Sequence, residues 1–291
     1  MTTAQVLPRS IASLFIQANL PGVSPYCAGA HVWGDVLRRF RSERPSLTVD
    51  LPGCGTGRRI GDTLTMTDLA AAVIDHLDEQ SLGSVHLVTH DLAGLVGLLL
   101  AIDQPERVAS LTIVSSAWAA PSGDGVDNLT LLHPPEPRWS SDSQRWAFER
   151  LSYSPLAIGN TLVAAALQTS AGAAHQSALR WARSGGARKF LASVAEAKAR
   201  FYQCARGAGL SVPIQVIATT DDALVSADHL LALFNIARAG QARSHFHIMN
   251  RCGSLPFRDD PETFFRLVTS FQDGLEQETT GRKHDGDDRQ R

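Results

Sequence analysis

The segment Leu87–Gly94 (LVTHDLAG) holds the residue best placed to do chemistry, Asp91. It lies between an apolar run that predicts a strand and one that predicts a helix, with the small residues Thr89 and Ala93 two positions away on either side. Small neighbours are needed where a sharp strand-to-helix turn strains the backbone of its central residue. The Asp91 carboxyl group, together with the N–H of Leu92, would then face the carboxyl ends of the strands, where open α/β folds bind ligands.

Strands and helices alternate on both sides of this turn, which predicts parallel βαβ units. Strands are predicted over residues 12–20, 47–51, 85–89, 108–115, 212–218 and 245–249, and helices over 32–44, 67–82, 92–103, 227–236 and 261–275. Such a sheet is covered by helices on both faces, so its strands are buried.

The alternation stops at Ala117 and resumes after about Leu210. Between them the periodicity predicts only helices, over residues 143–151, 156–167, 175–183 and 187–205. We therefore expect an α/β core from residues 1–116 and 211–276 and a helical cap from 117–210. The charged tail, 277–291, has no apolar face, so we expect it to be disordered.

The composition excludes several classes of protein. With 44% hydrophobic residues, 19% charged residues and a net charge of −2, the chain is globular and lacks the strong field that nucleic acid or an anionic membrane would select. No apolar run reaches the roughly 18 residues of a membrane helix. The four cysteines form no CxxC pair, so we expect reduced thiols, a cytoplasmic location, and no metal or cofactor. We expect a monomer or a homodimer.

One glycine-rich segment, DLPGCGTG at residues 50–57, invites comparison with a phosphate-binding loop. It lacks the Lys-Ser/Thr pair of such loops and the GxGxxG spacing, so we interpret it as a turn after a strand.

Several motifs, in their order, resemble those of the α/β-hydrolase family over nearly the whole chain. VTHDLAG is similar to the family's nucleophile elbow, DLPGCGTG to the preceding strand and turn, LPG at 20–22 to the oxyanion loop, VPIQVIATTDDALV to the strand that carries the acid, and MNRCGSLPFRDDPETF to the last strand and its loop. The resemblance implies an α/β-hydrolase fold, with a mostly parallel central sheet, helices on both faces and an inserted helical cap.

The chain departs from the family pattern at two catalytic positions. Asp91 stands at the nucleophile position, as in haloalkane dehalogenases and epoxide hydrolases, which form an ester with their substrate. Ser254 falls on the family's histidine, while Asp222, or Asp221 in the neighbouring register, keeps the acid position. A dehalogenase is disfavoured because its halide site has a Trp directly after the nucleophile, where this chain has Leu92.

Of these departures, the missing histidine has the largest consequence for the reaction. In hydrolysis by an aspartate nucleophile, that histidine activates the water that cleaves the ester, and losing a general base costs about 10²–10⁴-fold in rate. Serine has no pKa near neutrality and cannot replace it. A relocated base would restore hydrolysis, with His31 as the best candidate and His133 and His175 as weaker ones; His90 normally points into the core in this family.

Each candidate also has a purely structural interpretation. Asp91 could only stabilise the N-terminus of its helix, and Asp222 could only stabilise its loop. Ser254 is better explained as a passive pocket residue than as a nucleophile, because no base is assured beside it. His31 could lie at the surface or behind the site.

Our leading hypothesis is an enzyme that uses the hydrolase scaffold for a non-hydrolytic reaction. Asp91 would act as an acid–base group or fixed carboxylate, while the N–H groups of Val23 and Leu92 stabilise an enolate or alkoxide. This set suits cyclisation, elimination, isomerisation or epoxide opening on a bulky apolar metabolite of polyketide-type biosynthesis. The pocket would lie between core and cap, with Trp118 in its wall.

Two alternatives remain open. One is an epoxide hydrolase with a relocated base, in which the cap tyrosines Tyr153 and Tyr202 polarise the oxirane. The other is a non-catalytic protein that binds a small molecule on a decayed scaffold. We expect no ordinary triad relay of hydrogen bonds. The side chains of Asp91, Asp222 and Ser254 should nevertheless converge within the same pocket, because all three lie on loops at the carboxyl ends of strands.

Overall fold

The computed structural model describes residues 10–121, 131 and 133–287, with side chains up to Gln277. Within these residues, six strands form one sheet in the order β2-β1-β3-β4-β5-β6, and every neighbouring pair is parallel. The strands are β1 (Ser13–Ala18), β2 (Ser46–Thr48), β3 (Val85–Asp91), β4 (Val108–Val114), β5 (Ile214–Thr219) and β6 (His245–Met249). The α/β-hydrolase fold expected from the sequence is confirmed.

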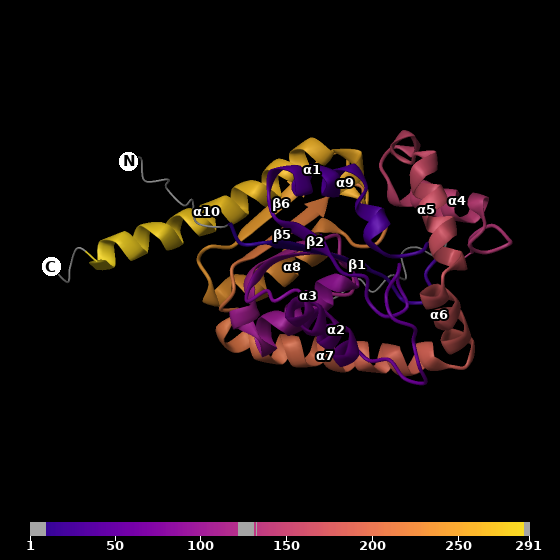
Figure 1. Cartoon of the computed structure of the whole chain (residues 1–291), viewed down its shortest axis with the longest axis horizontal. Coiled ribbons are helices and arrows are strands. Elements are labelled where there is room, and N and C mark those ends of the chain that lie inside the picture. Colours follow the sequence, from indigo (N-terminus) through magenta and orange to yellow (C-terminus); the bar gives the residue numbers. More distant parts are fainter. Residues whose placement is uncertain (1–9, 122–130, 132, 288–291) are drawn as a thin grey trace.

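Helices cover both faces of the sheet (Figure 1). One face carries α1 (Asp35–Glu43), α9 (Pro256–Asp259) and α10 (Pro261–Asp287); the other carries α2 (Met66–Glu79), α3 (Ala93–Asp103), α7 (Gly186–Ala208) and α8 (Ala227–Ala237). At the end of the sheet stand α4 (Ser141–Leu151), α5 (Asn160–Ala171) and α6 (Ala173–Arg183). Short 3-10 turns occur at Ala30–Trp33 (η1), Pro105–Arg107 (η2), Pro155–Ala157 (η4) and Arg238–Gly240 (η5).

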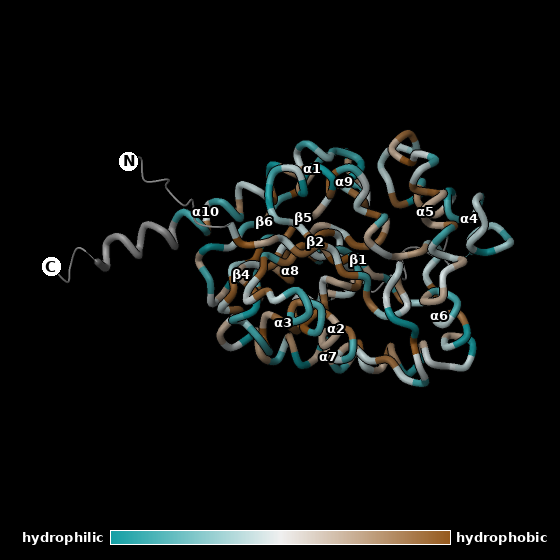
Figure 2. Tube along the Cα trace, viewed as in Figure 1, coloured by the Kyte–Doolittle hydropathy of each residue, from teal (hydrophilic) through white to brown (hydrophobic). Residues whose placement is uncertain are grey.

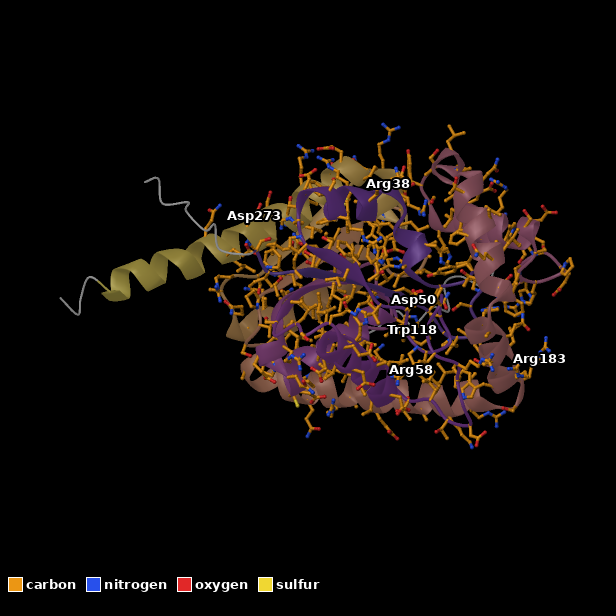
Figure 3. All side chains as sticks on the ribbon, viewed as in Figure 1. Arg38, Asp50, Arg58, Trp118, Arg183 and Asp273 are labelled. Carbon is orange, nitrogen blue, oxygen red and sulfur yellow. The ribbon has the colours of Figure 1, made fainter. Side chains whose placement is uncertain are left out.

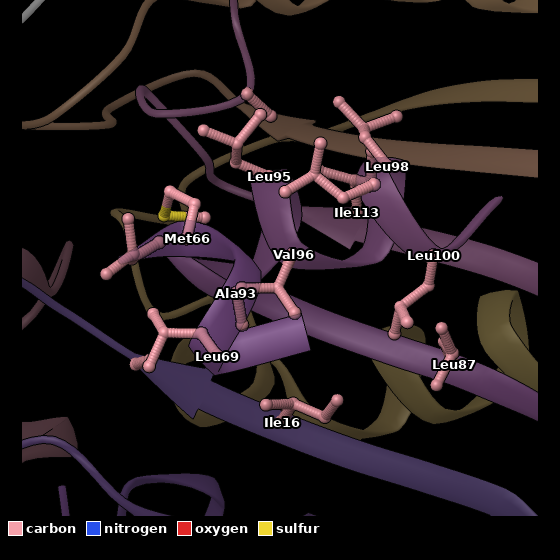
Figure 4. Close-up of a cluster of buried hydrophobic side chains, with 14 of the residues drawn as sticks. Ile16, Met66, Leu69, Leu87, Ala93, Leu95, Val96, Leu98, Leu100 and Ile113 are labelled. Atoms are coloured by element: carbon pink, nitrogen blue, oxygen red, sulfur yellow. The ribbon is translucent and has the colours of Figure 1, made fainter. Parts of the chain in front are cut away.

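The core is built around α3, whose sequence is apolar on every side. A helix of this kind has to be buried all round, and α3 lies between the sheet and the helices α2 and α7. Figure 4 shows Val96 and Leu100 of this helix among Ile16, Leu87 and Ile113 of the strands. The hydropathy colouring of Figure 2 shows the same concentration of apolar residues along the sheet and α3.

The long helix α7 differs from the expected domain division. The sequence assigns residues 187–205 to the cap, but in the structure α7 runs along the core beside α2, α3 and α8 (Figure 1). Its buried side, which includes Phe190, Val194 and Phe201, joins the same apolar cluster as those helices. The segment that stands over the carboxyl ends of the strands is therefore α4 to α6.

The C-terminal segment also differs from expectation. Helix α10 continues to Asp287, through most of the tail that the sequence predicts to be disordered. Glutamate, glutamine, lysine and arginine in this tail are good helix formers, so a helix can continue without an apolar face. The last four expected tail residues, 288–291, lie outside the described residues.

Within the described residues, no helix combines the length and apolar character needed to cross a membrane. The same part of the chain contains no group of three or more His, Cys, Asp or Glu side chains that could hold a metal ion. All four cysteines are free thiols, three of them buried.

Candidate active site

Asp91 ends β3 in the strained conformation that its small neighbours predict. Its φ is 58°, in the left-handed region, and the residue is only 3% exposed. Ser116 fixes the turn by donating its hydroxyl hydrogen to the Asp91 carbonyl oxygen at 2.6 Å. A Cβ at Gly94 would lie 2.5 Å from the Ser116 hydroxyl oxygen, so a side chain there would displace this contact. The turn thus holds Asp91 rigidly at the carboxyl end of the central strand.

Tyr26 is the hydrogen-bond partner of the Asp91 carboxylate. Its hydroxyl donates to Asp91 Oδ2 at 2.9 Å. The same hydroxyl accepts a hydrogen bond from Gln17 Nε2 at 3.0 Å, and the backbone N–H of Gly29 donates to Gln17 Oε1 at 2.7 Å. Because Gly29 fixes the amide orientation of Gln17, the Tyr26 hydrogen is left to point at Asp91.

The cap positions the loop that carries Tyr26. The Tyr26 ring packs on Phe148 of α4 with 5.3 Å between the ring centroids. On the same helix, Gln144 accepts the Cys27 N–H at 2.9 Å and donates to the Pro25 carbonyl at 3.1 Å. Helix α4 therefore ties this loop to the cap immediately beside Tyr26.

Burial raises the pKa of the Asp91 carboxyl to about 7, and the nearby charge of Asp222 adds to this rise. Hydrogen bonds from the Tyr26 hydroxyl, the Trp118 side chain and the Leu92 N–H act in the opposite direction by favouring the ionised form. Burial and the negative charge of Asp91 raise the pKa of Tyr26 well above its usual value. Tyr26 therefore stays protonated, while Asp91 gains and loses its proton near neutral pH.

Asp222 and Ser254 form a second polar cluster. Ser254 donates its hydroxyl to Asp222 Oδ1 at 2.6 Å and accepts the N–H of Ala223 at 3.2 Å. The Ser115 hydroxyl donates to the other Asp222 oxygen, and Leu224 donates its N–H to Oδ1 at 2.8 Å. Ser254 is fully buried, and its single hydroxyl hydrogen is already donated to Asp222, which fits a passive role.

Of the two possible registers, the structure brings Asp222 into this cluster. Asp221 is exposed and accepts the hydroxyl of its neighbour Thr220 at 2.6 Å. Burial raises the pKa of Asp222, although the hydroxyls of Ser115 and Ser254 act to lower it. Asp91 and Asp222 are close enough to influence each other's charge, but in the described part of the chain no hydrogen bond joins Asp91 to Ser254. The site therefore contains two carboxyl groups and no triad relay.

The histidine beside Asp91 belongs to the core. His90 Nε2 donates to the Ser254 carbonyl oxygen at 2.8 Å, and its ring packs against Trp33 and Phe257. Burial lowers the pKa of His90 to about 4, so the ring is neutral. His90 holds the backbone of Ser254 in place rather than serving as a base at Asp91.

The three histidines proposed as a relocated base contact other parts of the protein or solvent rather than Asp91. His31 lies within hydrogen-bonding reach of the Thr169 hydroxyl, 3.5 Å away, and lines a separate cavity. His175 contacts the Cys27 sulfur at 3.8 Å and the Trp139 ring, and His133 is exposed. Within the described residues none of the three hydrogen-bonds to Asp91, so the geometry gives no support to a relocated histidine.

Residues 20–267, which make up most of the chain, match the alpha/beta hydrolase family. This chain belongs to that family. Its relatives include the RutD protein of Variovorax paradoxus, named as a proposed carbamate hydrolase, at 39% identity over 97 residues. That match covers 31% of this chain and 36% of RutD, so the matched segment spans about a third of that relative's length.

Longer matches also point to hydrolases of the family. The 2-hydroxy-6-oxononadienedioate/2-hydroxy-6-oxononatrienedioate hydrolase of Cupriavidus pinatubonensis is 25% identical over 233 residues, 77% of this chain and 75% of its own. Among solved structures, the meta-cleavage product hydrolase CumD of Pseudomonas fluorescens IP01 superposes with a TM-score of 0.72 at 15% identity, covering 91% of this chain and 92% of CumD. The chain is thus an α/β-hydrolase-fold enzyme.

The two N–H groups expected to form an oxyanion hole have other partners in this α/β-hydrolase. The Val23 N–H donates to the Leu20 carbonyl at 3.2 Å. The Leu92 N–H donates to the Ala18 carbonyl at 3.0 Å and also interacts with the adjacent Asp91 carboxylate. Both are used within the backbone, so the geometry does not provide the pair of free donors that anion stabilisation requires.

Within the described residues, the two expected cap tyrosines have contacts other than Asp91. Tyr153 is 42% exposed and its ring faces the guanidinium of Arg251, while the Tyr202 hydroxyl donates to the Ala119 carbonyl at 2.6 Å. The third of the chain's three tyrosines, Tyr26, takes the place at the carboxylate. Its position just after the LPG motif of the oxyanion loop is the sequence signal that could have identified it.

Replacing Tyr26 by phenylalanine should raise the pKa of Asp91. The substitution removes the hydroxyl that donates to the ionised carboxylate and leaves the packing on Phe148 in place. We expect an increase of about one unit, the usual size of such an effect, measured by carbon-13 NMR titration of the Asp91 carboxyl. The control is Tyr202→Phe, which removes a hydroxyl that donates to the Ala119 carbonyl. It should leave the pKa of Asp91 unchanged. An unchanged Asp91 titration in Tyr26→Phe would contradict this assignment.

Proposed function

We propose that this α/β-hydrolase-fold enzyme uses Asp91 to take a proton from a small organic substrate and to return it, with Tyr26 holding the carboxyl group in place. The observation that carries the proposal is the buried carboxyl group of Asp91, with its pKa of about 7 and its hydrogen bond from Tyr26 at 2.9 Å. A group whose pKa lies near the working pH both accepts and releases protons efficiently, which general acid–base catalysis requires.

The surroundings of Asp91 argue against hydrolysis through an ester. Cleavage of an Asp91 ester would need a base to activate water, and Ser254 has its hydroxyl donated to Asp222. We therefore infer a non-hydrolytic reaction, such as an isomerisation, elimination, cyclisation or epoxide opening. In each case the proton that Asp91 removes returns to the substrate or its product, so no water is consumed.

The neighbours of Asp91 favour an apolar carbon segment at the reacting part of the substrate. Tyr26 and Trp118, the two side chains that hydrogen-bond to it, each present an aromatic ring with a single polar atom. Because Asp91 is only 3% exposed, we infer that the loop carrying Tyr26, or the cap helix α4 tied to it, moves to admit the substrate.

Hydrolysis without an ester is the second candidate function, and the names of the relatives favour it over the cyclase or lyase expected from the sequence. Both curated relatives described above are named as hydrolases. In this alternative, Asp91 removes a proton from a water molecule that attacks the substrate directly. Such a step needs no histidine, so it agrees with the same geometry.

Isotope labelling separates the two candidates. The probe is 2-hydroxy-6-oxononadienedioate, a dienol named in the relative from Cupriavidus pinatubonensis. For acid–base catalysis alone, we expect deuterium from heavy water on a carbon of the probe, an intact carbon skeleton and no oxygen-18 from labelled water. Oxygen-18 in a cleaved product would instead establish hydrolysis. If Asp91→Asn performs either reaction at the wild-type rate, both candidates fail.

A further inference from the structure

A second site lies apart from Asp91, in a cavity of about 760 Å³ between the core and the cap. Its walls come from η1 and α1, from β2 and the turn that follows it, and from the cap helices α5 and α6. Neither Asp91, Asp222 nor Ser254 lines this cavity. We propose that it binds a small organic anion, with a carboxylate or phosphate head and an apolar body.

Arg41 supplies the positive charge of the cavity wall. It is exposed, donates to the Thr48 hydroxyl at 3.3 Å, and has no carboxylate partner among the described residues. The wall's only carboxylate, on Asp50, is already used by donors of the protein: the Ala30 N–H at 2.7 Å, the Thr56 N–H at 2.7 Å and the Thr56 hydroxyl at 3.0 Å. An incoming anion would therefore meet an unpaired guanidinium and an acid whose charge is offset by three hydrogen bonds.

His31 also lines the cavity. Its Nε2 is buried, its Nδ1 lies 3.5 Å from the Thr169 hydroxyl, and the ring hydrogen-bonds to the Cys27 backbone. Burial lowers the pKa of His31 to about 4, so the ring is neutral. The neutral ring therefore contributes a polar surface to the wall and no charge that would oppose an anion.

The start of α6 lines the same cavity through Gly172, Ala173 and Ala174. No side chain caps this helix, and its first turn contains no acidic residue. The first N–H groups of a helix have no partner within the helix, and the helix dipole favours an anion beside them. This helix end adds to the preference for an anion that Arg41 creates.

The remaining wall explains why the ligand should be organic. Leu37, Ala165 and the methyl groups of Ala173 and Ala174 form apolar parts of the lining. The cavity is also far larger than an inorganic anion needs and falls in the usual size range of sites for small organic molecules. Figure 3 shows Asp50 of this wall near the centre of the molecule, whereas Arg38 lies at its outer edge.

Binding of hexanoate, hexyl phosphate and the neutral hexanamide tests the proposal without any activity assay. We follow the amide signals of Ala173 and Ala174 by nitrogen-15 NMR during each titration. At least one of the two anions should shift these signals saturably, and hexanamide should bind at least about tenfold more weakly, as expected for the loss of a charge-assisted hydrogen bond. Whichever of the two anions binds more tightly identifies the preferred head group, carboxylate or phosphate.

Arg41→Gln should weaken binding of the better anion by about tenfold or more. The matched control is Arg38→Gln, on the same helix α1, because Arg38 pairs with Asp35 and does not line the cavity. Asp91→Asn should leave the affinity unchanged, which keeps this proposal separate from the proposed function. The proposal is overturned if neither anion shifts the α6 signals, if hexanamide binds as tightly as hexanoate, or if Arg41→Gln binds like the wild type.

Discussion

Asp91→Asn should reduce turnover of the dienol probe by about 100-fold or more while making the protein more stable at pH 8. Asparagine keeps the size of the side chain and can still accept the Tyr26 hydrogen bond, but it neither takes up nor releases a proton. If Asp91 is the acid–base group, its removal costs the contribution of general acid–base catalysis, about 10²–10⁴-fold.

The gain in stability follows from the raised pKa of Asp91. The pKa of Asp91 is about 7 in the folded protein against an ordinary value of 3.8, so folding favours the protonated form. The unfolded chain therefore binds fewer protons than the folded one between about pH 4 and 7, and wild-type stability falls as the pH rises through this window. The full loss amounts to at most about 4 kcal/mol. Asparagine stays neutral at every pH in this window, so the variant does not undergo this loss of stability.

Urea unfolding at pH 4 and pH 8 measures this effect without a substrate. Asp91→Asn and the wild type should have similar free energies of unfolding at pH 4, and the variant should be more stable at pH 8. Asp62→Asn, at an exposed loop position, is the control for the same chemical change. A variant that loses stability equally at both pH values would indicate that Asp91 serves only as a structural group, as would wild-type turnover in the isotope assay.

The sequence placed Asp91, Asp222 and Ser254 at or after the carboxyl ends of strands, because short motifs carry each of them. A strand followed by a tight turn and a helix leaves a local pattern of apolar spacing and small residues, and parallel strands necessarily bring their carboxyl ends to one edge. The convergence of Asp222 with Ser254, at 2.6 Å, follows from that topology. Fold class and element order could be predicted for the same reason.

The position of Tyr26 after the LPG motif places it near the site, but its contact with Asp91 could not be predicted, because it joins residues 65 positions apart through an irregular loop. The course of that loop depends on Gln17, Gln144 and other side chains whose contacts no periodicity reveals. Likewise, helical spacing identified α7 but could not show which neighbours its apolar face would contact. Its packing on α2 and α3 depends on the tertiary arrangement of the whole core.

Ser254→His should give the enzyme a new activity, the hydrolysis of a simple epoxide such as styrene oxide. The new imidazole would stand beside Asp222, which already accepts a hydrogen bond from position 254 at 2.6 Å and could orient the ring. Asp91 could then attack the epoxide carbon, and the histidine would activate water to cleave the ester. We expect at least about 100-fold more diol than the wild type forms, the usual contribution of a general base.

Labelled water reports the route of this gained reaction. In a single turnover, water attacks the ester carbonyl, so oxygen-18 should appear in the Asp91 carboxyl group rather than in the diol. The double variant with Asp91→Asn should form no diol.

Because position 254 is fully buried, the larger ring should also lower stability by about 1–3 kcal/mol, which urea unfolding will measure. The same ring should slow proton transfer to the dienol probe, since it occupies space near the two carboxyl groups. A folded Ser254→His variant that makes no more diol than the wild type would show that Asp91 cannot reach an epoxide carbon, and it would leave Asp91 with proton transfer alone.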